Sequence, residues 1–126
     1  MTVLIDSWSW IEYWAGSKYA DAVAVYIDGS ESAIVSTINL AEVRYWFIRY
    51  YNELIADERI ARIQKRCFVI PVSDRIAIEA SKIKHDKKMG LADSIILATA
   101  NAEGAKVVTG DPDFAEVDGV MFIGKD

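Results

Sequence analysis

Several acidic residues of this chain occupy positions where their carboxylates could be brought together for chemistry. Asp6 directly follows the apolar segment 3–5, and Asp111 follows the segment 107–109 after one glycine. Both segments are predicted strands, and ligands of open parallel sheets bind beyond the carboxyl ends of the strands. We therefore expect the two carboxylates to face one cleft if their strands are neighbours. The alternative for each residue is a helix cap, because aspartate also begins helices well.

Two further acids, Asp93 and Glu42, are predicted to lie on helices. Asp93 shares its helix face with Ile96 and Leu97, in a segment that is apolar nearly all round and must be well buried. A carboxylate there needs a partner, because burying an unpaired charge costs several kcal/mol or forces protonation. Glu42 has two interpretations: it joins the same site, or it forms an ordinary salt bridge with Arg49 on its own helix face.

Carboxylates that converge without cations repel one another, so a site built from them calls for a divalent metal ion. Oxygen ligands suit Mg²⁺ or Mn²⁺, ions that bind phosphate, activate water and stabilise a leaving oxygen. The overall charge agrees, since 14 Lys and Arg against 19 Asp and Glu give −5, and acids held at a metal leave a nearly neutral body. Such a surface offers no general attraction to a phosphate backbone, so the metal would supply much of the positive field.

Other kinds of catalytic site find little support in the composition. Because His85 is the only histidine and Cys67 the only cysteine, a zinc site with several such ligands is excluded. His85 lies at a predicted exposed helix end, which disfavours Ser–His or Cys–His catalysis. A lone cysteine forms no intrachain disulfide, no apolar run is long enough to span a membrane, and the N-terminus does not resemble a signal peptide. We therefore expect a cytoplasmic protein with no membrane partner.

Short β-rich segments alternate with longer helical ones, the pattern of an α/β domain built around a parallel sheet. The strand-like runs are continuously apolar, as expected when helices cover both faces of the sheet. At 126 residues the chain suits one domain, 1–126, and is too short for two ordinary cores. Strands are predicted at 3–5, 33–36, 68–70, 106–109 and 120–123, and helices at 7–15, 18–28, 39–51, 54–66, 74–86 and 91–103.

Aromatic residues are concentrated on two of the predicted helices. Helix 39–51 is apolar over more than one face, and a small domain rarely supplies enough neighbours to cover such a helix. It is either a central core helix or a contact surface, and aromatic enrichment favours a contact surface. We expect a homodimer formed through helix 39–51 and its neighbouring surface. The early cluster of Trp8, Trp10, Tyr13 and Trp14 admits the same two interpretations, with the core favoured.

Four blocks of sequence carry these acids in a characteristic order. They are residues 3–7 (Val-Leu-Ile-Asp-Ser), 38–43 (Ile-Asn-Leu-Ala-Glu-Val), 91–100 (Leu-Ala-Asp-Ser-Ile-Ile-Leu-Ala-Thr-Ala) and 108–114 (Val-Thr-Gly-Asp-Pro-Asp-Phe). In order and spacing they resemble the motif blocks of PIN-domain proteins, and among these the VapC-type toxins of prokaryotic toxin–antitoxin pairs. The resemblance extends over the whole chain.

The resemblance implies a three-layer α/β/α sandwich whose central parallel sheet has the order 3-2-1-4-5. It also implies a Mg²⁺- or Mn²⁺-dependent endoribonuclease that uses a metal-activated water. By motif position, the acidic catalytic and metal-binding quartet corresponds to Asp6, Glu42, Asp93 and Asp111. Asp113 corresponds to a further metal ligand, and Ser7 and Thr109 correspond to supporting polar residues.

The resemblance further implies three partners: an RNA substrate, a second copy in a homodimer, and a small antitoxin protein whose helix lies across the toxin and blocks its site. Many relatives are more basic than this chain. The candidate RNA contacts are Lys82, Lys84, Lys87 and Lys88, for which a solvated helix end is the alternative interpretation.

The alternative function is a non-catalytic PIN-like scaffold that binds RNA or a protein, and the presence of all four acids argues against it. Two other α/β enzyme classes fit less well. Phosphoryl-accepting receiver domains carry adjacent acids after the first strand and a late Lys-Pro, whereas Asp6 stands alone and the chain has no Lys-Pro. Haloacid-type phosphatases need a second Asp two residues after the first, where this chain has Trp8.

Overall fold

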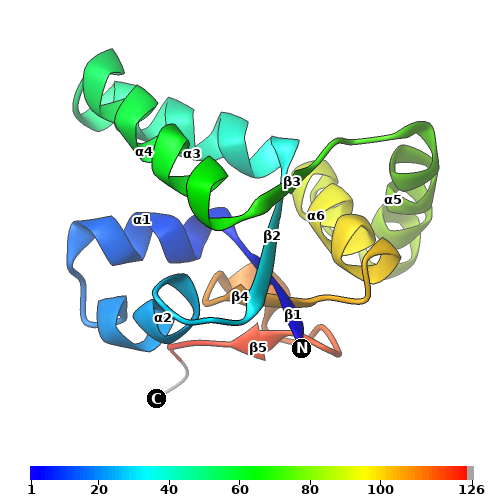
Figure 1. Ribbon diagram of the computed structural model, residues 1–126. Helices are drawn as coiled ribbons and strands as arrows, with labels where there is room; N and C mark the ends of the chain where they lie inside the picture. Colours follow the sequence, from blue (N-terminus) through cyan, green and yellow to red (C-terminus); the bar gives the residue numbers. More distant parts are fainter. Residues whose placement is uncertain (125–126) are drawn as a thin grey trace.

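A parallel sheet of five strands runs through the centre of the protein in the order β3-β2-β1-β4-β5 (Figure 1). The computed structural model describes residues 1–124, so Lys125 and Asp126, the last residues of the predicted domain, lie outside the described part. The strands are β1 (Thr2–Ile5), β2 (Ser32–Ser36), β3 (Phe68–Ile70), β4 (Lys106–Thr109) and β5 (Met121–Phe122). The predicted α/β class and strand order are confirmed.

Six α-helices connect and cover these strands, close to the predicted positions. They are α1 (Ser7–Ala15), α2 (Ala20–Ile27), α3 (Thr37–Tyr50), α4 (Glu53–Arg66), α5 (Asp74–Lys87) and α6 (Leu91–Ala102). Helix α3 begins two residues earlier than predicted, because Ser36 caps it and forms a reciprocal capping box with Asn39. A single 3-10 turn, η1 (Pro112–Phe114), was not predicted. No helix within residues 1–124 is long and apolar enough to cross a membrane.

Alternate residues of the central strands fill two separate cores, which makes the molecule three-layered. Val3 and Ile5 of β1 point toward helices α1 to α4, in a cluster with Trp10 and Phe47. Leu4 points to the opposite face, where α6 packs on the sheet and α5 packs outside α6 (Figure 1). Continuous apolar runs in the strands follow from this burial on both faces.

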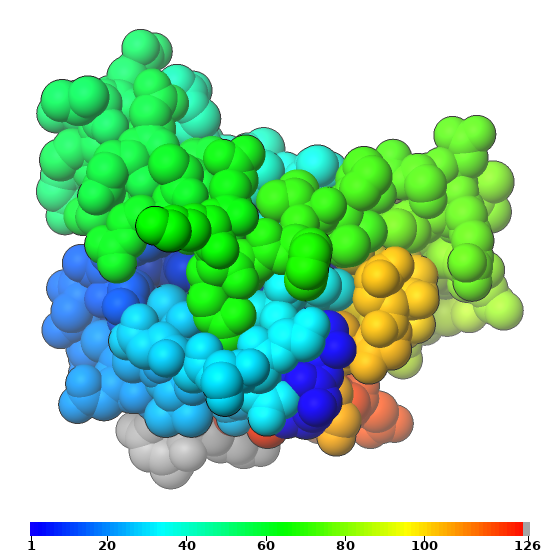
Figure 2. All heavy atoms as spheres, in the orientation of Figure 1, coloured from blue at the N-terminus to red at the C-terminus, as the bar shows by residue number. Residues whose placement is uncertain are grey.

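The two aromatic helices differ in how much of their surface the core covers. Trp10 of α1 is buried and donates its Nε1–H to the carbonyl oxygen of Ile5 at 3.1 Å. In α3 Phe47 is buried, whereas Tyr45 and Tyr50 keep 64% and 58% of their surface exposed. The end of the α3–α4 hairpin projects beyond the rest of the molecule (Figure 2). Helix α3 is therefore part core element and part open surface.

Arg66, at the end of α4, ties together the two ends of the connection between α2 and β2. Its guanidinium donates to the carbonyl oxygens of Ile27 at 2.7 Å, Tyr26 at 2.9 Å and Glu31 at 2.9 Å. The first two carbonyls belong to the last turn of α2, where oxygens have no partner within the helix and the helix dipole favours a cation. This contact holds α2 and α4 together beside the sheet.

Replacing Arg66 by alanine should lower the free energy of unfolding by about 2–3 kcal/mol, since a charged donor shared by partly buried carbonyls is lost. Lysine at this position should restore only part of the loss, because it lacks the planar fork. Arg75→Ala, at an exposed position of α5, is the control and should change stability by less than about 0.5 kcal/mol. Urea unfolding of the three variants measures this, and equal stability of Arg66→Ala and Arg75→Ala would contradict the role assigned to Arg66.

Candidate functional site

The carboxyl ends of β1 and β4, which are neighbours in the sheet, open into a cavity of about 340 Å³. Asp6 enters it from the end of β1 and Asp111 from the loop after β4, while Glu42 and Asp93 come from α3 and α6. The cavity is lined by Asp6, Ser7, Trp8, Ile11, Glu42, Tyr45, Trp46, Asp93 and Asp111. The four acids of the predicted quartet therefore reach one space from four separate elements, whereas Asp113 is not among the lining residues.

Asp6 is the buried centre of the site. It occupies the position before α1 but makes no side-chain capping bond, so its carboxylate is free for other partners. Thr109 Oγ1 donates to Asp6 Oδ2 at 2.8 Å, and Asn39 Nδ2 donates to Oδ1 at 3.3 Å. The pKa of Asp6 is raised to about 6: burial is the main cause, the bond from Thr109 opposes it, and the charges of Glu42 and Asp111 add to the increase.

A short chain of hydrogen bonds connects Asp6 to Glu42. Asn39 Nδ2 also donates to Ser7 Oγ at 2.9 Å, and Ser7 Oγ donates to Glu42 Oε1 at 2.7 Å. Burial raises the pKa of Glu42, Asp111 raises it further, and the bond from Ser7 lowers it. The alternative partner of Glu42, Arg49, instead places its guanidinium 5.5 Å from the centre of the Tyr50 ring.

Asn39 is a site residue to which the sequence analysis assigned no role. It is fully buried, and its Oδ1 accepts from the backbone N–H of Ser36 at 2.8 Å. Ser36 and Asn39 have the spacing of a capping box, which was the one signal available in the sequence. That local pattern explains the side-chain oxygen of Asn39 but not its amide nitrogen, which turns toward Asp6 and Ser7.

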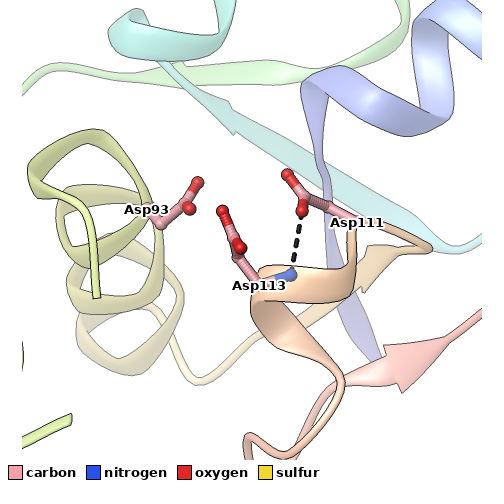
Figure 3. A group of neighbouring side chains, drawn as sticks. All are labelled: Asp93, Asp111 and Asp113. Atoms are coloured by element: carbon pink, nitrogen blue, oxygen red, sulfur yellow. Dashed lines mark hydrogen bonds between the residues drawn. The ribbon is translucent and has the colours of Figure 1, made fainter. Parts of the chain in front are cut away.

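Asp111 and Asp113 are oriented by a tight turn after β4. The backbone N–H of Asp111 donates to Thr109 Oγ1 at 3.1 Å, and that of Asp113 donates to Asp111 Oδ1 at 2.9 Å (Figure 3). Asp111 thus also caps η1, as the alternative interpretation of this residue expected. At Gly110 the Trp8 ring and the Ile123 carbonyl oxygen fill the space that a side chain would need, so only glycine fits there.

Asp93, in the first turn of α6, faces the turn that carries Asp111 and Asp113 (Figure 3). One carboxylate oxygen from each of the three residues lies within 4.8 Å of the others. Burial, together with the neighbouring acids Asp111, Asp6 and Asp113, raises the pKa of Asp93 from 3.8 to about 7. These acids repel one another and share no compensating cation in the cavity, whose lining within residues 1–124 includes no lysine or arginine.

The donor set fits a hard divalent cation. Asp93, Asp111 and Asp113 offer only oxygen ligands at a spacing that one ion can bridge, which suits Mg²⁺ or Mn²⁺. Asp6 and Glu42 lie outside this closest group and line the cavity from the end of β1 and from α3. The candidate RNA-contact residues Lys82, Lys84, Lys87 and Lys88 lie on and just after the last turns of α5 and are not among the lining residues.

Comparisons with known proteins agree with this geometry. The family model of the PIN domain matches residues 3–120, while a comparison with curated proteins found no match. A toxin–antitoxin complex from Klebsiella pneumoniae shares 26% identity, with a TM-score of 0.76 over 94% of each chain. Mycobacterium tuberculosis VapC20, a toxin that cleaves the sarcin-ricin loop, shares 17% identity, with a TM-score of 0.79 over 97% of this chain and 99% of its own. FitAcB from Neisseria gonorrhoeae shares 22%, with a TM-score of 0.73 over 97% and 96%.

The raised pKa of Asp93 predicts how the stability of the metal-free protein depends on pH. The unfolded chain loses this proton near pH 3.8, whereas the folded protein keeps it to about pH 7. Between these values the folded state binds more protons, so stability should fall as the pH rises through this range and then level off. Asp93→Asn should weaken this dependence, leaving the part that the raised pKa of Asp6 contributes, and at pH 8 it should melt no lower than the parent. Thermal melts in chelator at pH 5 and pH 8 measure both effects.

The matched control for this test is Asp74→Asn. Asp74 is also an acid in the first turn of a helix, α5, but it is exposed and lies outside the cavity. Its removal should lower the melting temperature slightly at both pH values, because the helix dipole loses a favourable charge. If Asp93→Asn were destabilised in the same way, Asp93 would be an ordinary helix-end acid and the stored repulsion would be absent.

Proposed function

The chain belongs to the PIN-domain family, as its four motif blocks predicted, and we propose that it is a single-domain endoribonuclease that hydrolyses RNA with Mg²⁺ or Mn²⁺. The observation that carries the proposal is the group of Asp93, Asp111 and Asp113 at the carboxyl end of the sheet, with Asp6 and Glu42 in the cavity that Asp93 and Asp111 also line. Structural neighbours are VapC and FitB toxins of toxin–antitoxin complexes. We further propose that the chain is such a toxin and acts in the cytoplasm.

Asp93, Asp111 and Asp113 would hold the metal, with Asp6 and Glu42 available as further ligands or as groups that orient water. When bound, the ion neutralises charge on the phosphodiester and makes water a better nucleophile. Thr109 and Asn39 fix both oxygens of Asp6, so this carboxylate is oriented before substrate arrives. Such preorganisation removes the reorganisation that a solvent-exposed carboxylate would need at the moment of reaction.

Two protein partners belong to this proposal. The first is a small antitoxin that covers the cavity, as the resemblance implies; an insert with both basic and apolar side chains would complement the acids and the apolar wall of Trp8 and Ile11. The second is another copy of the chain, joined through α3 and its neighbouring surface, where Tyr50 and Tyr51 are 58% and 56% exposed. An unpartnered aromatic surface of this kind is typical of a protein contact.

The nuclease proposal predicts metal-dependent cleavage of RNA. The parent should cleave with Mn²⁺ or Mg²⁺ and lose all activity in chelator, while Asp6→Asn and Asp111→Asn should each lose about a hundredfold or more. Asp118→Asn, at an exposed position outside the cavity, is the control and should keep full activity. Gel analysis of cleaved RNA measures this.

A second measurement separates metal binding from turnover. Mn²⁺ should stabilise the parent by about 2.7 kcal/mol at a hundredfold excess over its dissociation constant, and Asp93→Asn should lose most of this gain. Stabilisation by Mn²⁺ without cleavage of any RNA would favour the non-catalytic scaffold. If Mn²⁺ neither stabilises the parent nor supports cleavage, the metal site is refuted.

The oligomeric state gives an independent prediction. Light scattering should show a homodimer at micromolar concentration, and Tyr50→Glu should shift it toward monomer by placing a charge in an apolar contact. Val25→Glu is the control, since Val25 is 67% exposed on α2, away from α3. A parent that is monomeric at all these concentrations would contradict the dimer.

A further inference from the structure

The acid cavity continues along one face of helix α3 as an aromatic surface. One helix face carries Glu42 and, three, four and seven residues after it, Tyr45, Trp46 and Arg49. Glu42 belongs to the acid group, and Tyr45 and Trp46 line the same cavity. The acids and the aromatic side chains of α3 therefore line the same cavity.

The two aromatic side chains are presented in different ways. Trp46 is half-buried and supported by the rings of Phe47 and Tyr50, whose centres lie 5.0 Å and 4.6 Å from its own. Tyr45 keeps 64% of its surface exposed. Trp46 thus contributes a ring that its neighbours hold in place, and Tyr45 contributes a more exposed ring to the same lining. Trp46 also packs against the core that α3 reaches through Val43 and Phe47, whereas Tyr45 is not part of that core.

The charge of the cavity determines how a nucleic acid could be held there. Among the described residues that line it, none is a lysine or arginine, and the whole chain carries a net charge of −5. Contacts from basic side chains, which supply most of the affinity in ordinary nucleic-acid sites, are missing from this lining. Stacking of bases on aromatic rings is the other main source of affinity, and it needs no cation on the protein.

We propose that Tyr45 and Trp46 are positioning residues that stack on unpaired bases beside the phosphodiester held at the acid group, and so select single-stranded RNA. The inference rests on the proposed nuclease function and adds the form of the substrate and the residues that recognise it. A duplex keeps its bases stacked on one another and cannot offer them to these rings. Arg49, which lies beside Tyr45 and Tyr50 on this face, can add one phosphate contact. With stacking as the main source of affinity, binding should therefore depend only weakly on salt.

The test compares steady-state cleavage of one single-stranded RNA by matched variants. Tyr45→Ala and Trp46→Ala should each raise KM about 5- to 150-fold, the equivalent of ~1–3 kcal/mol for one stacked base at room temperature, with kcat changed far less. Tyr45→Phe and Trp46→Phe should stay close to the parent, because the ring remains. Phe68→Ala is the control: Phe68 is an exposed aromatic residue (73%) of β3 that does not line the cavity.

Binding is measured separately, by anisotropy of a labelled single-stranded oligonucleotide with Ca²⁺ in place of Mg²⁺, and with the same strand in a duplex. The parent should prefer the single strand at least tenfold, with a shallow salt dependence, and both alanine variants should lose the preference. Because Tyr45 is exposed, Tyr45→Ala should fold even if Trp46→Ala does not, which circular dichroism checks.

The outcomes distinguish this inference from the function on which it rests. If the parent cleaves RNA but KM and binding are unchanged in Tyr45→Ala, the nuclease stands and the stacking role is wrong. If Tyr45→Ala instead converts a dimer to a monomer with unchanged RNA affinity, this face is covered by a second copy and the inference is also overturned. If the parent cleaves no RNA, the proposed function fails, and the binding arm alone decides whether these rings hold single strands.

Discussion

The buried carboxylate of Asp6 is the constraint around which the site is built. Its two oxygens are held by Thr109 of β4 and Asn39 of α3, so the neighbouring strand and the helix after β2 are both tied to the end of β1. Thr109 Oγ1 in turn accepts a hydrogen bond from the backbone N–H of Asp111, and Asn39 positions Ser7 against Glu42. The other acids therefore take their places through polar contacts that begin at this one side chain.

The arrangement is unfavourable for the metal-free protein, and the rest of the molecule offsets it. Burial and mutual repulsion raise the pKa values of Asp6, Glu42 and Asp93 together. Two apolar cores, one on each face of the sheet, supply the stability that such a group removes. Charge clusters of this kind are retained where they serve function rather than folding.

Most of the fold could be predicted from sequence, because continuous apolar runs and helical periodicity are local patterns. The strand-end placement of Asp6 and Asp111 also followed from local pattern, since parallel strands all end at one edge. The role of Asn39 could not be predicted, because its capping box with Ser36 already accounts for it locally. The inclusion of Asp113 in the closest group of acids depends on the η1 turn, in which its backbone N–H donates to Asp111, and this turn was not predicted.

The acidic composition of the chain and the aromatic side chains of α3 both fit a site that binds its substrate without basic side chains. A basic cavity would neutralise the acids without a metal, and it would also hold RNA by its phosphates whatever the base conformation. In this cavity the lining within the described residues has no basic side chain. Under the proposed function, an ion would compensate the charge and the rings of Tyr45 and Trp46 would supply affinity. Affinity that comes from stacking depends on whether bases are unpaired, whereas affinity for phosphate does not. In the proposed nuclease, the shortage of cations in the lining would make binding respond to the structure of the RNA rather than to its charge.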